Sequence, residues 1–178
     1  MQWSDEQCDA AITALFRIKE TFDAGGRIPH RVYEPWLRVQ KKFSTETVVF
    51  NQRGEIYLIQ RPHSTVDPYS DLWHGPGVTH LPREFEPLAW KRLHESELGG
   101  CNLEGPHFVV AIEQEEETRG LYQLRIHIAR TTDDLLHEDT QHRFFGADSL
   151  PPELVRSHRE LIIPIGIAAA KARGWISY

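Results

Sequence analysis

Cysteine, long apolar runs and excess positive charge are all scarce in this sequence. Its two cysteines, Cys8 and Cys101, lack the spacing of a metal-binding pair, so we interpret both as ordinary thiols. No apolar run approaches the roughly 18 residues that a membrane-spanning helix needs, so we expect no membrane partner. With 20 Lys and Arg against 26 Asp and Glu, the net charge of -6 offers no basic surface for general nucleic-acid binding. A small anionic ligand needs only local positive charge, which this balance permits.

The length of 178 residues and the 40% hydrophobic content suit one domain with a proper core. We expect residues 1–42 to form an N-terminal helix and connector, and residues 43–178 to form the main domain. Ser4 and Gln7 have the spacing of a capping box. Apolar side chains then recur at helical spacing, at Cys8, Ile12, Leu15, Phe16 and Phe22. This helix either covers an edge of the domain or makes a subunit contact, which gives a possible homodimer. With no apparent signal peptide, we expect a reduced, cytoplasmic setting.

Strand patterns dominate the main domain. Residues 45–50 and 55–60 flank a turn sequence, which predicts a hairpin, and residues 107–112 predict another strand. Residues 122–128 alternate between apolar and polar side chains, which is typical of a half-buried strand. The acidic run from Glu113 to Glu117 is predicted to be a hairpin tip or a solvated loop.

A helix is predicted near the end of the chain. Ser157 and Glu160 have the spacing of a second capping box, and the helical pattern is kinked at Pro164 and ends near Gly174. Strands mixed with helices on this scale predict an α/β sandwich around a mixed sheet.

One specific motif lies between Trp73 and Gly99. It starts with Trp-His-Gly-Pro-Gly-Val and continues from residue 88 as Leu-Ala-Trp-Lys-Arg-Leu-His-Glu-Ser-Glu-Leu-Gly. This segment resembles the Nudix box, in which a Trp and a Pro-Gly-Gly loop are followed by a Glu and a helix reading Arg-Glu-aliphatic-x-Glu-Glu-x-Gly. The resemblance implies a Nudix-like α/β/α sandwich, here with an added N-terminal helix. It also implies hydrolysis of a nucleoside diphosphate linked to another group, assisted by Mg²⁺ or Mn²⁺ on the helix carboxylates.

Two registers of this helix on the Nudix box are open. In the first, Ala89 and Leu93 take the two core-facing positions, and the catalytic trio becomes Arg92, Glu95 and Ser96. We prefer this register, because residues four apart share one face of a helix and the buried stripe is then apolar. It requires one extra residue before the closing glycine.

In the second register, Gly99 and Arg92 match the family's glycine and arginine without a gap, and Glu84 falls on the early glutamate. The trio then becomes Leu93, Ser96 and Glu97. Either register keeps one of the three carboxylates, so the resemblance implies a degenerate metal-binding box.

The candidate site residues follow from both registers. The candidate catalytic carboxylates are Glu84, Glu95 and Glu97. The candidate ligand-binding residues are Arg61, Lys91, Arg92, Gly77 and Trp73. Arg61 ends the second predicted strand, where its fork of donors suits phosphate oxygens. In the first register Arg92 can pair with Glu95, and this face either contacts an anion directly through Arg92 and Lys91 or is simply solvated.

The candidate metal ligands are Glu95 and His80. Trp73 followed by His80 is similar to the isopentenyl-diphosphate isomerase branch, where a metal-binding His has that relation to the Trp. That branch carries its catalytic Cys where this chain has Val78, so we do not expect the isomerase reaction. A further hypothesis is a histidine metal site formed by His74, His80 and His94.

The sequence therefore allows three functions. The first is a weakened or silent Nudix-like protein that binds a nucleotide-like or phosphorylated ligand beside the box helix. The second is an active, divalent-metal-dependent diphosphate hydrolase with displaced carboxylates, drawn from Glu84, Glu95 and one of Glu113, Glu115, Glu116 or Glu117. The third is a non-catalytic structural or interaction role through the N-terminal helix.

Overall fold

The computed structural model describes residues 3–29, 31–32, 41–65, 67–81, 83–116, 120–132 and 138–177. The chain divides into two compact units. The first comprises Met1–Lys41 and Glu115–Leu121, and the second comprises Lys42–Gln114 and Tyr122–Tyr178.

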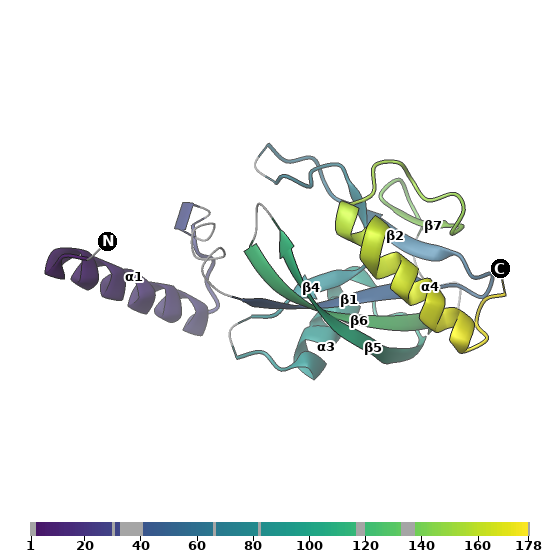
Figure 1. Ribbon diagram of the computed structural model, residues 1–178, viewed down its shortest axis with the longest axis horizontal. Coiled ribbons are helices and arrows are strands. Elements are labelled where there is room, and N and C mark those ends of the chain that lie inside the picture. Colours follow the sequence, from purple (N-terminus) through teal and green to yellow (C-terminus); the bar gives the residue numbers. More distant parts are fainter. Residues whose placement is uncertain are drawn as a thin grey trace. The chain divides into compact units, whose positions relative to one another are not determined.

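Helix α1, Asp5–Asp23, belongs to the first unit (Figure 1). The predicted capping box is confirmed: the Ser4 hydroxyl accepts the Gln7 backbone N–H at 3.3 Å, and the Gln7 side chain accepts the Ser4 N–H at 2.9 Å. No residue within Asp5–Asp23 is buried. The apolar face predicted from the sequence is therefore present but not sealed inside a core.

The second unit is built on a mixed sheet, which has seven strands within the described residues. The strands are β1 Lys42–Phe50, β2 Ile56–Gln60, β3 Trp73–His74, β4 Gly77–Thr79, β5 Leu103–Glu116, β6 Gly120–Thr131 and β7 His142–Phe145. They run in the order β3-β2-β1-β6-β5, with β4 added to β1 and β7 added to β2. Strand β1 pairs antiparallel with β2 and β4 but parallel with β6, as expected for a mixed sheet.

The predicted hairpin between β1 and β2 is confirmed. The Asn51 side-chain oxygen accepts the backbone N–H groups of Arg53 and Glu55, each at 2.9 Å, and so closes the turn. Gly54 completes it with a φ of 81°, which a residue with a side chain adopts only at a cost. Local turn chemistry thus sets the hairpin.

The two later strands are longer than the sequence pattern predicts. The alternation over β6 is confirmed from Tyr122 to Ile126, but residues 126–129 are all buried, His127 included, so this part of the strand is not half-buried as predicted. The loop predicted for the acidic run is wrong from Glu113 to Glu116, because β5 continues through these residues. Glu113 and Glu115 are exposed, so the strand's own alternation keeps their charges in water. Glu117 lies outside the described residues.

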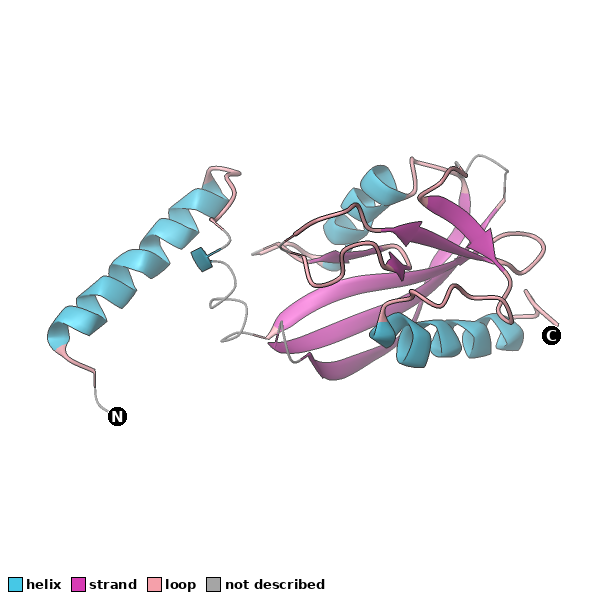
Figure 2. Ribbon diagram, turned by 90° about the horizontal axis from the view of Figure 1, so that it is seen from above, coloured by secondary structure: helices cyan, strands magenta, loops and turns pink. Residues whose placement is uncertain are grey.

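Helices α3, Glu86–Glu97, and α4, Ile163–Ala172, cover opposite faces of the sheet (Figure 2). Ala89 and Leu93 of α3 are fully buried with Val49 of β1, which confirms the predicted apolar stripe. On the other face, α4 packs Ile163 and Ala170 against a core that includes Val48. The domain is therefore an α/β/α sandwich. Among the described residues, no helix is long and apolar enough to span a membrane.

The predicted capping box at Ser157 is wrong. Ser157 has helical backbone angles and makes no capping bond through its side chain, while Glu160 pairs with Arg156 instead. A π-helical turn, η1, covers His158–Ile162 and leads directly into α4. Pro164 has no N–H to donate to the preceding turn, so the change of helix type falls where the sequence predicts a kink.

Replacing Gly166 by Ala tests the close packing of α4 on β1. A Cβ at Gly166 would lie 2.5 Å from Val48 Cγ2 and 2.7 Å from Val48 Cβ. Overpacking should therefore outweigh the better helix propensity of Ala and lower the free energy of unfolding by about 1–3 kcal/mol. Urea denaturation measures this loss. In a Val48→Gly background, which removes the Cβ as well as both methyl groups, the same change should cost much less, and an equal loss there would contradict the proposed contact.

Candidate functional site

The loop Gly75-Pro76-Gly77 lies along β1 between β3 and β4. The Thr47 backbone N–H donates to the Pro76 carbonyl at 2.9 Å, and Gly77 pairs with Glu46 across the two strands. The Glu46 carboxylate comes so close to Gly77 that a Cβ at this position would clash with it. A larger residue at position 77 would therefore force the Glu46 carboxylate to move away from the loop.

Glu97, the last residue of α3, reaches the same loop. Its Oε2 accepts the Gly77 N–H at 2.9 Å. Burial raises the pKa of Glu97 to about 7, although the Gly77 hydrogen bond and the positive charges of Arg61 and Arg92 oppose the shift. Near neutral pH this carboxyl therefore changes its charge readily. Glu46 and Glu97 both contact Gly77, so two carboxyl groups flank one glycine.

His158 fixes the first residue of the loop. Its Nδ1 accepts the Gly75 N–H at 3.1 Å, so the proton of the neutral ring is on Nε2, which lies 3.8 Å from Glu46 Oε2. Burial, with help from the charges of His74 and Arg61, lowers the pKa of His158 to about 3. The imidazole is therefore neutral at physiological pH and acts as a fixed acceptor rather than as half of an ion pair.

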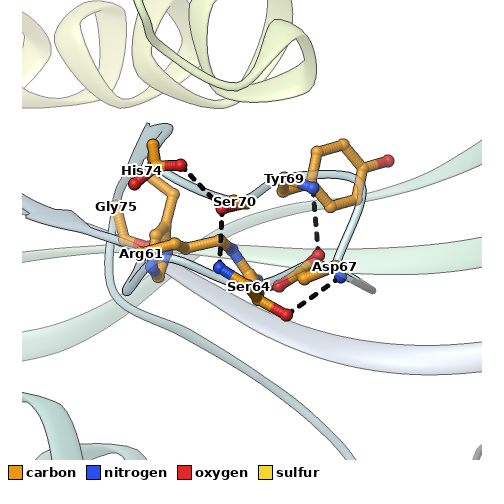
Figure 3. Close-up of polar contacts among 8 residues, drawn as sticks. Arg61, Ser64, Asp67, Tyr69, Ser70, His74 and Gly75 are labelled. Atoms are coloured by element: carbon orange, nitrogen blue, oxygen red, sulfur yellow. Dashed lines mark hydrogen bonds and ion pairs between the residues drawn. The ribbon is translucent and has the colours of Figure 1, made fainter.

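Arg61 follows β2 and lies beside this loop (Figure 3). Its Nη1 pairs with Asp67 Oδ2 at 2.7 Å, and Asp67 also accepts the Tyr69 N–H at 3.0 Å. The Arg61 side chain is 30% exposed, yet its Nε is buried and has no hydrogen-bond partner among the described residues. Because Arg61 affects the pKa of both Glu97 and His158, it belongs to the same electrostatic cluster.

Arg92 makes a bidentate ion pair with Glu84. Its Nε and Nη2 donate to the two Glu84 oxygens at 3.0 and 2.7 Å, and Nη2 also donates to the Thr79 carbonyl at 2.9 Å. The predicted pairing of Arg92 with Glu95 is therefore wrong. Glu84 precedes the helix and can present both oxygens in the plane of the guanidinium, which a residue on the same helix cannot match as well. These contacts hold the segment before α3 against the helix.

The other predicted residues of α3 face solvent. The side chains of Lys91 and Glu95 are 70% and 63% exposed and lie 3.8 Å apart. The helix thus combines the apolar stripe of the first register with a loop-facing carboxylate from the second, because Glu97 rather than Glu95 meets Gly77.

A second ion pair, not foreseen from the sequence, joins α3 to β6. Both oxygens of Glu86 accept from Arg125 at 2.6 Å, and Glu86 Oε1 lies 3.1 Å from His127 Nε2. The Arg125 hydrogen bonds lower the pKa of Glu86 despite its partial burial. Glu84 and Glu86 are thus both committed to arginines.

Trp73 and the histidines that the sequence suggested as site residues all contact other groups of the protein. Trp73 is 8% exposed and packs edge-on against Phe145, so its side chain belongs to the core. His74 contacts the Gly75 carbonyl, His80 the Thr45 hydroxyl and His94 the Cys101 carbonyl. Within the described ranges, no group of three or more His, Cys, Asp or Glu residues is placed to hold a metal, so the histidine-site hypothesis is wrong there.

Glu46 and His158 are the site residues that sequence reasoning missed. Glu46 stands between two threonines in an otherwise strand-like run, and a carboxylate in a strand buried on both faces is a detectable anomaly. His158 lies 83 residues from Gly75, so its contact depends on the fold alone.

Solved structures with the same fold give the site a context. A MutT/Nudix family protein from Listeria innocua matches with a TM-score of 0.60 and 14% identity, over 76% of this chain and 98% of that chain. An ADP-ribose pyrophosphatase from Streptococcus suis matches with a TM-score of 0.53 and 18% identity, over 73% of this chain and 92% of that chain. A Nudix hydrolase from Nitrosomonas europaea matches with a TM-score of 0.53 and 13% identity, over 78% of this chain and 97% of that chain.

These matches are structural. No protein-family model matches the sequence, and no curated protein matches it either. The shared arrangement covers nearly the whole length of each solved structure. The chain therefore has the Nudix fold.

Proposed function

We propose that this protein binds a nucleotide-like or phosphorylated ligand beside the loop Gly75–Gly77 and hydrolyses it weakly or not at all. The observation that carries the proposal is the state of the carboxylates around α3. Glu84 and Glu86 are held by arginines, and Glu95 faces solvent. Glu97 remains at the loop, but its pKa is raised to about 7. Mg²⁺ is usually held by one or two ionised carboxylates together with substrate phosphates, so a site whose loop-facing carboxyl group is easily protonated should bind it weakly.

Arg61 is the residue that we assign to the ligand. Its position beside the loop and its partial exposure suit a phosphate oxygen, which accepts from a guanidinium in a short, charge-assisted hydrogen bond. Arg92 is a poorer candidate than the sequence predicts, because Glu84 and Thr79 already accept from it. The solved ADP-ribose pyrophosphatase shares this fold, so ADP-ribose is a reasonable first probe.

A catalytically active hydrolase is the second candidate function, and one observation favours it. Glu46 and Glu97 both contact Gly77, which brings two carboxyl groups to the same loop residue. If a cation and a diphosphate were bound together, Glu46 and Glu97 would be the protein ligands of the cation, and the metal would activate water. This pair replaces the displaced carboxylates predicted from the sequence.

The Glu97→Gln variant tests the raised pKa. Because the folded-state pKa lies above the ordinary value of 4.5, the folded protein holds more protons between pH 4.5 and about 7, and stability falls as the pH rises through that window. We expect the variant to match the wild type near pH 4.5 and to exceed its free energy of unfolding by about 1–3 kcal/mol at pH 8.

Denaturant unfolding at several pH values measures this difference. The exposed Glu95→Gln change is the matched control and should shift stability by no more than about 0.5 kcal/mol at any of these pH values. A difference between wild type and Glu97→Gln that does not vary with pH would show that Glu97 titrates normally.

Calorimetry with Mg²⁺ and Mn²⁺ separates the two functions. Without a probe, we expect no binding at about millimolar metal, because the described residues supply too few ionised oxygens. Tight binding that strengthens with ADP-ribose and disappears in both Glu46→Gln and Glu97→Gln would instead show that these two carboxyl groups hold a metal, as the hydrolase requires. An assay for the release of AMP from ADP-ribose would then test hydrolysis itself.

Substituting Arg61 tests the ligand contact. We expect Arg61→Ala to weaken the binding of ADP-ribose by about tenfold or more. Arg61→Lys should have an intermediate effect, because lysine keeps the positive charge but cannot make the bidentate hydrogen bonds of a guanidinium. Arg156→Ala, which removes an arginine whose side chain is 86% exposed, is the control. Equal affinity in all four proteins, measured with ADP-ribose and with inorganic diphosphate, would rule out Arg61 as the anion contact.

A further inference from the structure

Helix α1 carries an exposed apolar strip formed by Cys8, Ile12, Leu15 and Phe16. The exposed fractions of Ile12, Leu15 and Phe16 are 51%, 57% and 61%, and Cys8 is an exposed free thiol. Residues three and four apart share a face of a helix, so these side chains form one continuous surface. Water contact over three large apolar side chains of one helix is costly, which marks the strip as an interaction surface.

The charges beside the strip indicate which surface it fits. Asp5 lies near its N-terminal end and Lys19 near its C-terminal end, each seven residues from Ile12. Lys19 pairs with Asp23 on its own helix, but both side chains are about half exposed, and such a pair contributes little. A helix with the same strip, running in the opposite direction, would place Asp5 beside Lys19 at both ends. A parallel copy would set like charges side by side.

Side-chain size favours the same arrangement. About Ile12 as the centre, Cys8 and Phe16 are equidistant, each four residues away. In an antiparallel pair the small Cys8 of one helix meets the large Phe16 of the other, and Ile12 meets Ile12. In a parallel pair the two cysteines would face each other and leave a gap beside two crowded phenylalanines, which packs less well.

We infer that α1 is a self-association helix, which pairs antiparallel with α1 of a second copy of this chain through Cys8, Ile12 and Phe16, with Leu15 at the edge of the contact, opposite Asp9. The surface is short, about 28 Å for 19 residues, so the dimer forms reversibly and depends on protein concentration. This inference concerns α1 alone and does not depend on the proposed ligand.

Sedimentation velocity on the full chain, from about 5 to 500 μM, tests the association. We expect a monomer–dimer equilibrium in the wild type and at least about a tenfold weaker association in Ile12→Asp, because that change puts two charges at the centre of the pair. Ala10→Asp is the matched control: it adds the same charge two residues away on the other side of α1 and should change the association constant less than about twofold. A wild type that stays monomeric, or equal effects of both variants, would overturn the inference.

The direction of pairing has its own test by mild oxidation. In the antiparallel pair the two Cys8 residues lie about 12 Å apart along the axis, which is too far for a disulfide. Wild type should therefore stay uncrosslinked, whereas Phe16→Cys should crosslink through Cys8, and adding Cys8→Ser should abolish the crosslink. Cys101 is buried and should not react. Rapid crosslinking of wild type through Cys8 would overturn the antiparallel arrangement.

Charge reversal gives a check that needs no cysteine. Asp5→Lys and Lys19→Asp should each weaken association, because each creates like charges across the pair. The double variant should recover most of the wild-type association constant. If the double variant is weaker than either single variant, Asp5 and Lys19 do not meet across the interface and the antiparallel pairing is wrong.

Discussion

The backbone pairing of β1 on both of its edges is the constraint on which the rest of the domain depends. One edge pairs in parallel with β6 from Lys42 to Phe50, and the other carries β2 and β4. Helices cover both faces, so almost every side chain of β1 is buried. A carboxylate in such a strand has little freedom, and Glu46 is therefore held against Gly77, where the second carboxyl group of the site also arrives.

The acidic residues of the box segment differ in the direction of their pKa shifts, because their neighbouring side chains differ. Glu84 and Glu86 each face both oxygens toward an arginine, and hydrogen bonds from that arginine lower the pKa of each. Glu97 accepts a backbone N–H but makes no such ion pair among the described residues, so burial dominates and raises its pKa. The same residue type thus has opposite charge behaviour within one short segment, and the difference depends on which side chains from other elements lie nearby.

Features set by near neighbours along the chain were predictable. The capping box of α1, the turn closed by Asn51 and the buried stripe of Ala89 and Leu93 all follow from spacing or turn chemistry within a few residues. The sequence pattern failed at Ser157, where Glu160 pairs with the neighbouring Arg156 instead, and also where distant segments compete. Spacing allowed Arg92 to pair with a residue on its own helix, but Glu84 from the preceding loop offers better geometry for two parallel hydrogen bonds.

The sequence by itself determined the fold class, the box segment and the scarcity of carboxylates in it, because periodicity and residue identity are local properties. Only the tertiary structure decided which carboxylate reaches the loop, because that depends on how α3 lies across β1 rather than on the register of a motif. It also decided that His158, far along the chain, accepts from Gly75 and is kept neutral by burial. Long-range packing sets both the partners of a titratable group and the polarity around it, and the neighbouring residues along the chain predict neither.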